Sequence, residues 1–141
     1  MRVVLDANVL TSGAVALPGR PLALVIERWI GRRYLLFVSA WLRMEVERTL
    51  AKPYFAARLA PGDRVRFLAL IDQRAGIVVP TVPVEGVATH PEDDRVLETA
   101  LAARAEYLVT GDRGLQQLRA FAGIPIIDPA AFLAVLDRAV V

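Results

Sequence analysis

The sequence contains no cysteine, and its 141 residues include a single histidine, His90, and a single lysine, Lys52. Disulfide bonds, thiolate zinc sites and cysteine nucleophiles are therefore excluded, and one chain cannot build a histidine-rich metal site. Lys52 precedes a proline and does not follow a glycine-rich loop, so a Walker A phosphate-binding motif is absent, as is a G-x-G-x-x-G dinucleotide motif. The side chains left for chemistry are carboxylates and arginines.

Charge of one sign does not dominate the chain, and long hydrophobic runs are also missing. Seventeen basic residues against fifteen acidic ones give a formal net charge of +2. Almost all the basic residues are arginine, which binds phosphate through a bidentate fork, although a general compositional preference for arginine would look the same. The balance permits a nucleic-acid partner without requiring one. No apolar run approaches the ~20 residues of a membrane helix and no signal peptide precedes the first strand, so we expect a soluble, cytoplasmic protein.

Short apolar runs alternate with longer segments of helical periodicity along the whole chain. Loops are expected over 11–20 and 80–90, and the expected strands are 2–5, 34–38, 77–79, 107–110 and 124–127. Helices are expected over 21–30, 39–51, 61–76 and 91–104, after Asp112, and from Pro129 onward. Strands separated by helices indicate an α/β fold, a three-layer sandwich around a five-stranded parallel sheet, and a single domain over 1–141 accounts for the chain.

Two aspartates follow expected strands directly. Asp6 comes after the first strand, and Asp112 comes two residues after Thr110, the last residue of the fourth. Open α/β sheets bind ligands beyond the carboxyl ends of their strands, which is where both side chains would lie. Each aspartate could instead simply cap the turn or helix that follows it.

Three further acidic residues lie on helices near the same edge. On the expected helix over 39–51, Glu45 falls at the rim of the apolar stripe, about 60° from Leu42. Asp93 and Asp94 lie in the first turn of the helix that begins at Pro91, a position that the helix dipole favours for any acid. The alternative for Glu45 is an exposed side chain paired with a neighbouring arginine.

Several carboxylates in one crevice repel one another, by about 4 kcal/mol per pair at 4 Å and an effective dielectric constant of 20. A divalent cation removes this penalty, and an all-oxygen site without histidine or cysteine suits Mg²⁺ or Mn²⁺. Such an ion can activate water and stabilise the charge that develops on a phosphoryl group.

The same segments resemble those of the PIN-domain family. The opening Val3-Val4-Leu5-Asp6-Ala7-Asn8-Val9-Leu10 is similar to the family's first motif, and Tyr107-Leu108-Val109-Thr110-Gly111-Asp112-Arg113 to a second. The segment Ser39 to Leu50 resembles the helix with the family's glutamate, and Asp94-Arg95-Val96-Leu97 resembles its third acidic motif. The resemblance runs over nearly the whole chain in the right order, and within the family it is greatest to VapC-like toxin components of bacterial toxin–antitoxin systems.

The resemblance implies a metal-dependent endoribonuclease that cleaves single-stranded RNA, with a sheet of strand order 3-2-1-4-5. It implies that Mg²⁺ or Mn²⁺ is held by four catalytic acids, which are Asp6, Glu45, Asp94 and Asp112, with Asn8 and Thr110 as supporting polar groups. Relatives often carry an acid at the position of His90, so the third acid is Asp94 with Asp93 as the alternative. The role of His90 stays open between a plain loop residue and a phosphate contact or proton shuttle.

The sequence also leads to expectations about partners. Four arginines share elements with the acids and are expected to contact RNA phosphates, namely Arg43, Arg48, Arg95 and Arg113. The resemblance further implies a protein antitoxin and a homodimer. Two other functions stay open: a non-catalytic domain that binds RNA or protein, and an Asp-nucleophile phosphatase, which would need a proton donor where Asn8 stands.

Overall fold

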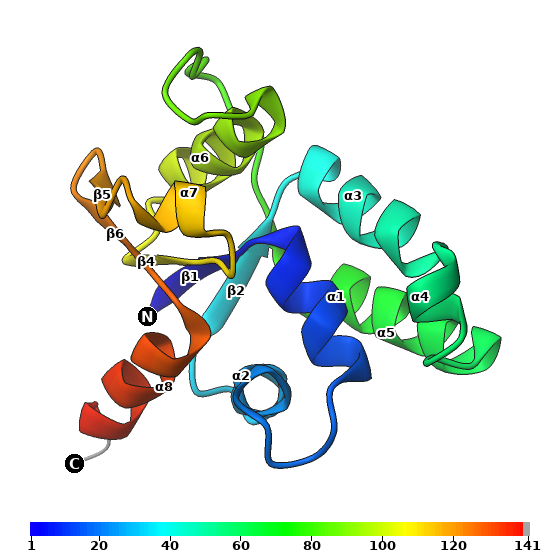
Figure 1. The fold of residues 1–141 in the computed structure, drawn as a ribbon. Coiled ribbons are helices and arrows are strands. Elements are labelled where there is room, and N and C mark those ends of the chain that lie inside the picture. Colours follow the sequence, from blue (N-terminus) through cyan, green and yellow to red (C-terminus); the bar gives the residue numbers. More distant parts are fainter. Residues whose placement is uncertain (140–141) are drawn as a thin grey trace.

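The computed structural model describes residues 1–139 and consists of a central, mainly parallel sheet between layers of helices (Figure 1). The strands lie in the order β3-β2-β1-β4-β6-β5. Their bounds are β1 (Arg2–Leu5), β2 (Leu35–Val38), β3 (Gly76–Ile77), β4 (Tyr107–Val109), β5 (Ala120–Phe121) and β6 (Ile124–Ile127). With β6 as the fifth expected strand, the α/β class and the order 3-2-1-4-5 are confirmed.

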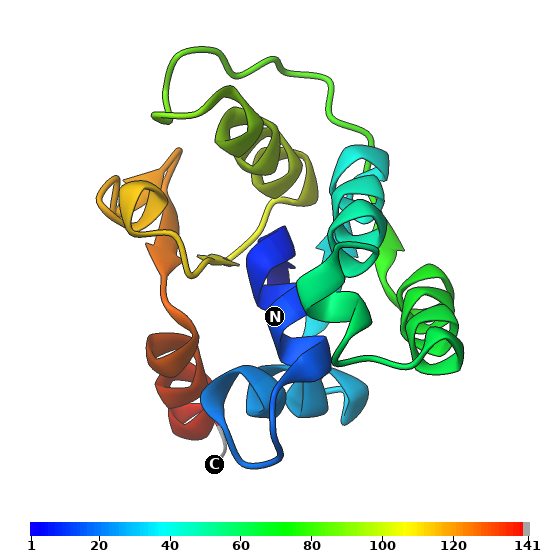
Figure 2. The ribbon, with the colours of Figure 1, turned by 45° about the vertical axis from the view of Figure 1, so that its right-hand side comes forward.

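The helices are α1 (Ala7–Val15), α2 (Pro21–Ile30), α3 (Ala40–Leu50), α4 (Pro53–Ala56), α5 (Pro61–Arg74), α6 (Pro91–Ala103), α7 (Arg113–Gln116) and α8 (Pro129–Arg138). Helix α1 packs against both α2 and α3, whereas α6 packs across β1 and β2 (Figures 1 and 2). The central strands are buried, with Val3, Val4 and Leu5 of β1 fully enclosed. Between residues 1 and 139, no helix is long and apolar enough to cross a membrane.

Two parts of the fold differ from the sequence prediction. The chain over 7–15 is a helix, although a loop was expected from Thr11 onward. Thr11 fits in this helix because its hydroxyl donates a hydrogen bond to the Ala7 carbonyl, 2.8 Å away. The sheet also differs at its edges: β3, at one edge, is only two residues long, and at the opposite edge a sixth strand, β5, pairs antiparallel with β6. The turn between β5 and β6 uses left-handed backbone at Ala122 and Gly123.

Gly13 lets α1 and α2 approach closely. A Cβ atom at this position would lie 2.5 Å from Ile26 Cγ1 and 3.0 Å from the Leu22 carbonyl oxygen, which as backbone cannot swing away. We expect Gly13→Ala to lower the free energy of unfolding by about 1–3 kcal/mol through overpacking, despite the higher helix propensity of alanine. Urea unfolding curves measure the difference.

Gly62→Ala is the matched control, because a Cβ on this other helical glycine would meet only the flexible end of Arg66, at 3.6 Å. It should leave the unfolding midpoint unchanged or raise it. Equal stability of the two variants would show that the close packing of α1 against α2 does not require a glycine at position 13.

Candidate active site: acidic residues at the strand ends

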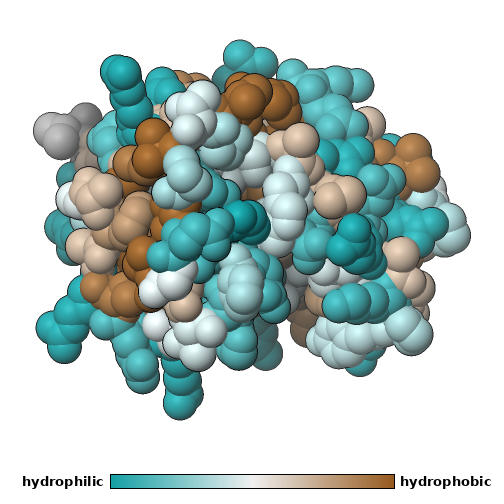
Figure 3. Space-filling model, turned by 90° about the horizontal axis from the view of Figure 1, so that it is seen from above, coloured by the Kyte–Doolittle hydropathy of each residue, from teal (hydrophilic) through white to brown (hydrophobic). Residues whose placement is uncertain are grey.

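A polar pocket of about 400 Å³ lies beyond the carboxyl ends of β1 and β4. In Figure 2 the beginning of α1 lies between α3, α6 and α7, and the helices α1, α3 and α6 contribute most of the pocket wall. Five carboxylates line it: Asp6, Glu45, Glu92, Asp93 and Asp112. The face of the molecule seen from above is largely hydrophilic, with hydrophobic residues gathered mainly to one side (Figure 3).

Asp6 is fixed where β1 meets α1. Its backbone N–H donates to the Val109 carbonyl at 2.9 Å, which continues the parallel pairing of β1 with β4. Only 6% of Asp6 is exposed. Its Oδ1 accepts the Ala7 N–H at 2.7 Å, and its Oδ2 accepts the Thr110 hydroxyl at 2.8 Å. Burial raises the pKa of Asp6, and the hydrogen bond from Thr110 opposes that shift.

Thr110 connects the two strand-end aspartates. Its hydroxyl donates to Asp6 and accepts the backbone N–H of Asp112 at 3.0 Å. Asn8 joins the same loops, since its Oδ1 accepts the Gly111 N–H at 3.1 Å. Asp112 in turn caps α7 by accepting the Leu115 N–H at 2.8 Å. Both aspartates therefore cap the helices that follow them, which was the alternative to a role in the site, and both also line the pocket.

Of the two candidates for the third acid, Asp93 lines the pocket, whereas Asp94, the first choice from the sequence, does not. Desolvation, reinforced by the negative charges of Asp6 and Asp112, raises the pKa of Asp93 to about 6. The carboxylates of Asp6 and Asp112 are thus close enough to Asp93 to affect its ionisation.

Asp94 faces the opposite way, into the loop that precedes α6. It is 2% exposed, and its carboxylate accepts the backbone N–H groups of Gly86, Val87 and Ala88 at 3.0, 3.2 and 2.7 Å. Adjacent residues on a helix point about 100° apart, so only one of the two aspartates can reach the pocket. Asp94 instead holds the loop over 86–88 in place.

Glu45 lines the pocket from α3, and its Oε1 also accepts a hydrogen bond from Arg48 Nη1 at 3.0 Å. Both outcomes expected for it therefore occur together. Glu92, the exposed neighbour of Asp93, also lines the pocket and was not expected to, since its only sequence signal was the run of three acids. His90, whose role the sequence left open, lines it as well, at the N-cap of α6 without capping it through its side chain.

Three of the four arginines expected to bind RNA are held by carboxylates. Arg43 pairs with Asp72 at 2.7 Å and with Glu47 at 3.2 Å. Arg48 pairs with Glu45 at 3.0 Å, and Arg95 with Glu85 and Glu98. Within residues 1–139, Arg113 alone of the four forms no ion pair.

The lining suits a divalent cation, because five of its residues carry carboxylates, and carboxylate oxygens are the ligands that hard divalent cations prefer. In the part of the chain that the structure describes, no three acidic side chains already form a ready metal-binding group. Binding an ion would therefore require side-chain rotation. Asp93 and Glu45 are only partly buried and can rotate, whereas Asp6 is held by its hydrogen bonds.

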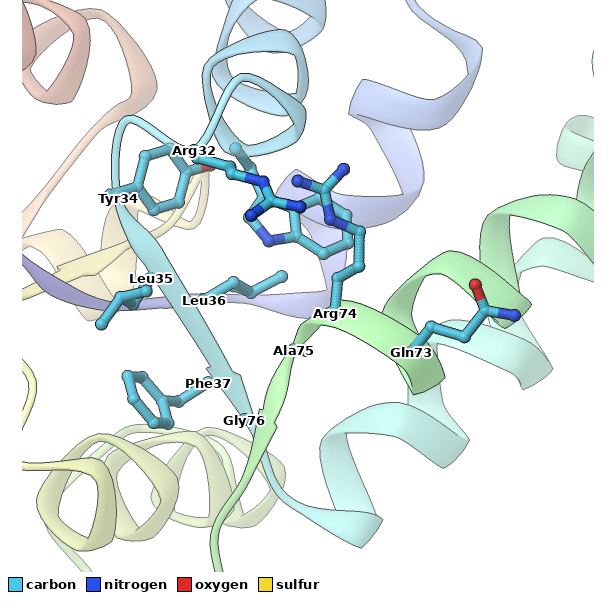
Figure 4. Close-up of a pocket in the computed structure, with 10 residues that line it drawn as sticks. Arg32, Tyr34, Leu35, Leu36, Phe37, Gln73, Arg74, Ala75 and Gly76 are labelled. Atoms are coloured by element: carbon cyan, nitrogen blue, oxygen red, sulfur yellow. The ribbon is translucent and has the colours of Figure 1, made fainter.

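A larger cavity of about 480 Å³ lies near the start of β2, and Figure 4 shows its lining. Trp29, Tyr34 and Leu36 contribute apolar surface, and Arg32 and Arg74 contribute positive charge. No carboxylate lines it, so it does not offer the ligands that the acidic pocket offers.

Comparison with known proteins gives a family and two solved folds. A family model described as PIN domain matches residues 2–114. The crystal structure of PAE2754 from Pyrobaculum aerophilum superposes with a TM-score of 0.69 at 21% identity, over 98% of this chain and 90% of that one. The crystal structure of VapBC2 from Rickettsia felis bound to a DNA fragment from its promoter superposes with a TM-score of 0.62 at 13% identity, over 91% of this chain and 98% of that one. No curated protein sequence matches significantly.

Proposed function

The chain belongs to the PIN-domain family, and we propose that it is an endoribonuclease that hydrolyses single-stranded RNA with Mg²⁺ or Mn²⁺ as cofactor. PIN domains are generally nucleases. The observation that supports the proposal most strongly is the acidic pocket itself, in which the negative charges of Asp6 and Asp112 add to desolvation and raise the pKa of Asp93. Natural proteins retain such repulsion at functional sites, because a bound cation offsets it.

Four carboxylates of this chain would hold the ion, directly or through water: Asp6, Glu45, Asp93 and Asp112. When bound, a divalent cation activates water and stabilises the charge that develops on a phosphoryl group. Thr110 and Asn8 hold the strand ends so that Asp6 and Asp112 face the same space. Because Asn8 uses its side-chain oxygen to accept the Gly111 N–H, it is a structural support, and an amide at this position cannot be the proton donor that an Asp-nucleophile phosphatase would need there.

The proposed biological role is that of the toxin in a toxin–antitoxin pair in the cytoplasm. The resemblance of the sequence to VapC toxins and the likeness of the fold to VapBC2 from Rickettsia felis support it. We accordingly propose a protein antitoxin and a homodimeric assembly as partners.

Metal removal tests the proposed activity. The purified chain should cleave a fluorescent single-stranded RNA in Mg²⁺ or Mn²⁺, stop cleaving in excess EDTA, and recover when excess metal is returned, because the carboxylates cannot promote hydrolysis without the ion. Denaturing gel electrophoresis measures the products. Cleavage that persists in EDTA would contradict the metal requirement, and RNA binding without cleavage would favour the non-catalytic binding domain.

A further inference from the structure

A second groove, of about 420 Å³, lies next to the acidic pocket and carries the opposite charge. Four side chains line it: Arg113, Gln116, Gln117 and Arg119. The lining contains two guanidinium groups, two amides and no carboxylate. We call this the α7 groove.

The α7 groove is fixed to the strand end that also positions Asp112. Helix α7 begins directly after Asp112, which caps it, and Gln116 Nε2 donates to the Thr110 carbonyl oxygen at 2.7 Å. After α7 the chain turns sharply. Arg119 adopts left-handed backbone (φ 62°) and its N–H donates to the Gln116 carbonyl at 3.0 Å, so that it lines the same groove as Arg113.

Pairing separates these two arginines from the others near the pocket. Arg43, Arg48 and Arg95 are each neutralised by one or more carboxylates. Arg113 and Arg119 are exposed, and among residues 1–139 neither has a carboxylate within ion-pair distance. A guanidinium that no internal carboxylate occupies is available to bind an external anion as a bidentate donor.

We propose that the α7 groove binds the phosphates of the RNA strand next to the bond that is cut, an inference that rests on the proposed nuclease function. An acidic pocket repels a polyanion, and a positive groove beside it supplies attraction where the strand leaves the pocket. Contacts to phosphate set the register of a nucleic acid without reading its bases. The amides of Gln116 and Gln117 add uncharged donors between the two arginines.

The test is a binding titration of a short fluorescent oligouridylate in EDTA, where no cleavage occurs, at several salt concentrations. The double variant Arg113→Gln/Arg119→Gln should bind about 10-fold more weakly at low salt. Its plot of log affinity against log salt should be flatter by about 1.4, or about 0.7 for each phosphate that the variant no longer neutralises. In Mg²⁺ the variant should show a raised KM and a nearly unchanged kcat, because neither arginine lines the acidic pocket.

The control is Arg64→Gln/Arg66→Gln, which removes the same formal charge from α5, on the far side of the molecule from α7 (Figures 1 and 2), although Arg66 is paired with Asp63 there. It should bind RNA nearly as the wild type does. If the α7 variant binds RNA with wild-type affinity and salt dependence, the inference is overturned and the groove serves another anionic partner, such as an acidic protein segment. A third outcome separates the two proposals. If the wild type binds RNA but does not cleave it, and the α7 variant does not bind, the RNA-binding role of the groove is supported and the nuclease function is refuted.

Discussion

Asp6→Asn should reduce the rate of RNA cleavage by at least about 100-fold, the scale expected when a preorganised charged group is removed from a catalytic site. The change keeps the size of the side chain and an oxygen that can accept the Ala7 N–H, so the helix cap survives. It removes the negative charge from the most deeply buried acid of the pocket. Initial rates on a fluorescent RNA in Mn²⁺, with circular dichroism to verify folding, measure the effect.

Asp128→Asn provides the control for this variant. Asp128 also caps a helix, because its Oδ1 accepts the Ala131 N–H at 2.7 Å, and it does not line the acidic pocket. Its substitution should leave the cleavage rate unchanged. Similar rates for Asp6→Asn and wild type would show either that Asp6 has no catalytic role or that the cleavage comes from a contaminant.

The adjacent residues Asp93 and Asp94 should respond to the same substitution with opposite changes in stability. The pKa of Asp93 is raised to about 6, so the folded state disfavours its ionised form at neutral pH. Asp93→Asn removes this penalty and should raise the free energy of unfolding at pH 7.5 in EDTA by about 1 kcal/mol, a value discounted for the partial exposure of the side chain. As the pH falls below 6 the wild-type carboxylate becomes protonated in the folded state, and the advantage of the variant should shrink and disappear near pH 3.8, the ordinary pKa of the group.

Asp94→Asn should instead lower the free energy of unfolding by about 3 kcal/mol. The carboxylate accepts three backbone N–H groups, and an asparagine there has one oxygen to offer and turns its NH₂ group toward the remaining donors. Thermal unfolding of both variants in EDTA compares them, and the cleavage assay should find only Asp93→Asn folded but inactive. A stabilised, inactive Asp94→Asn beside an unaffected Asp93→Asn would restore Asp94 as the third acid.

The sequence was sufficient to place Asp6 and Asp112 at one edge of the sheet. Both follow apolar strands, and parallel strands bring their carboxyl ends to the same edge. That the two strands are neighbours was implied by the resemblance to the PIN-domain family, and β1 does pair with β4 in the structure.

The features that the sequence could not show depend on interactions between distant segments. Asp93 and Asp94 have almost the same sequence context, and what separates them is the path of the loop over 86–88, which no periodicity encodes. The pairing of Arg43 with Asp72 joins residues 29 positions apart, so a helical wheel of α3 cannot show it. Helix α1 was not predicted, and a loop was expected from Thr11 onward, because Thr11 and Gly13 are weak helix formers; packing against α2 and α3 overrides that preference.

The central claim, that carboxylates from four separate elements gather to hold one kind of ion, is tested most directly by a crystal grown in millimolar Mn²⁺ and measured for anomalous scattering. We expect a manganese peak within coordination distance of Asp6, Asp93 and Asp112, with Glu45 as a direct or water-mediated ligand and Asp94 still bound to its loop. Well-ordered density for the empty pocket, or a manganese ion ligated by Asp94, would contradict the account.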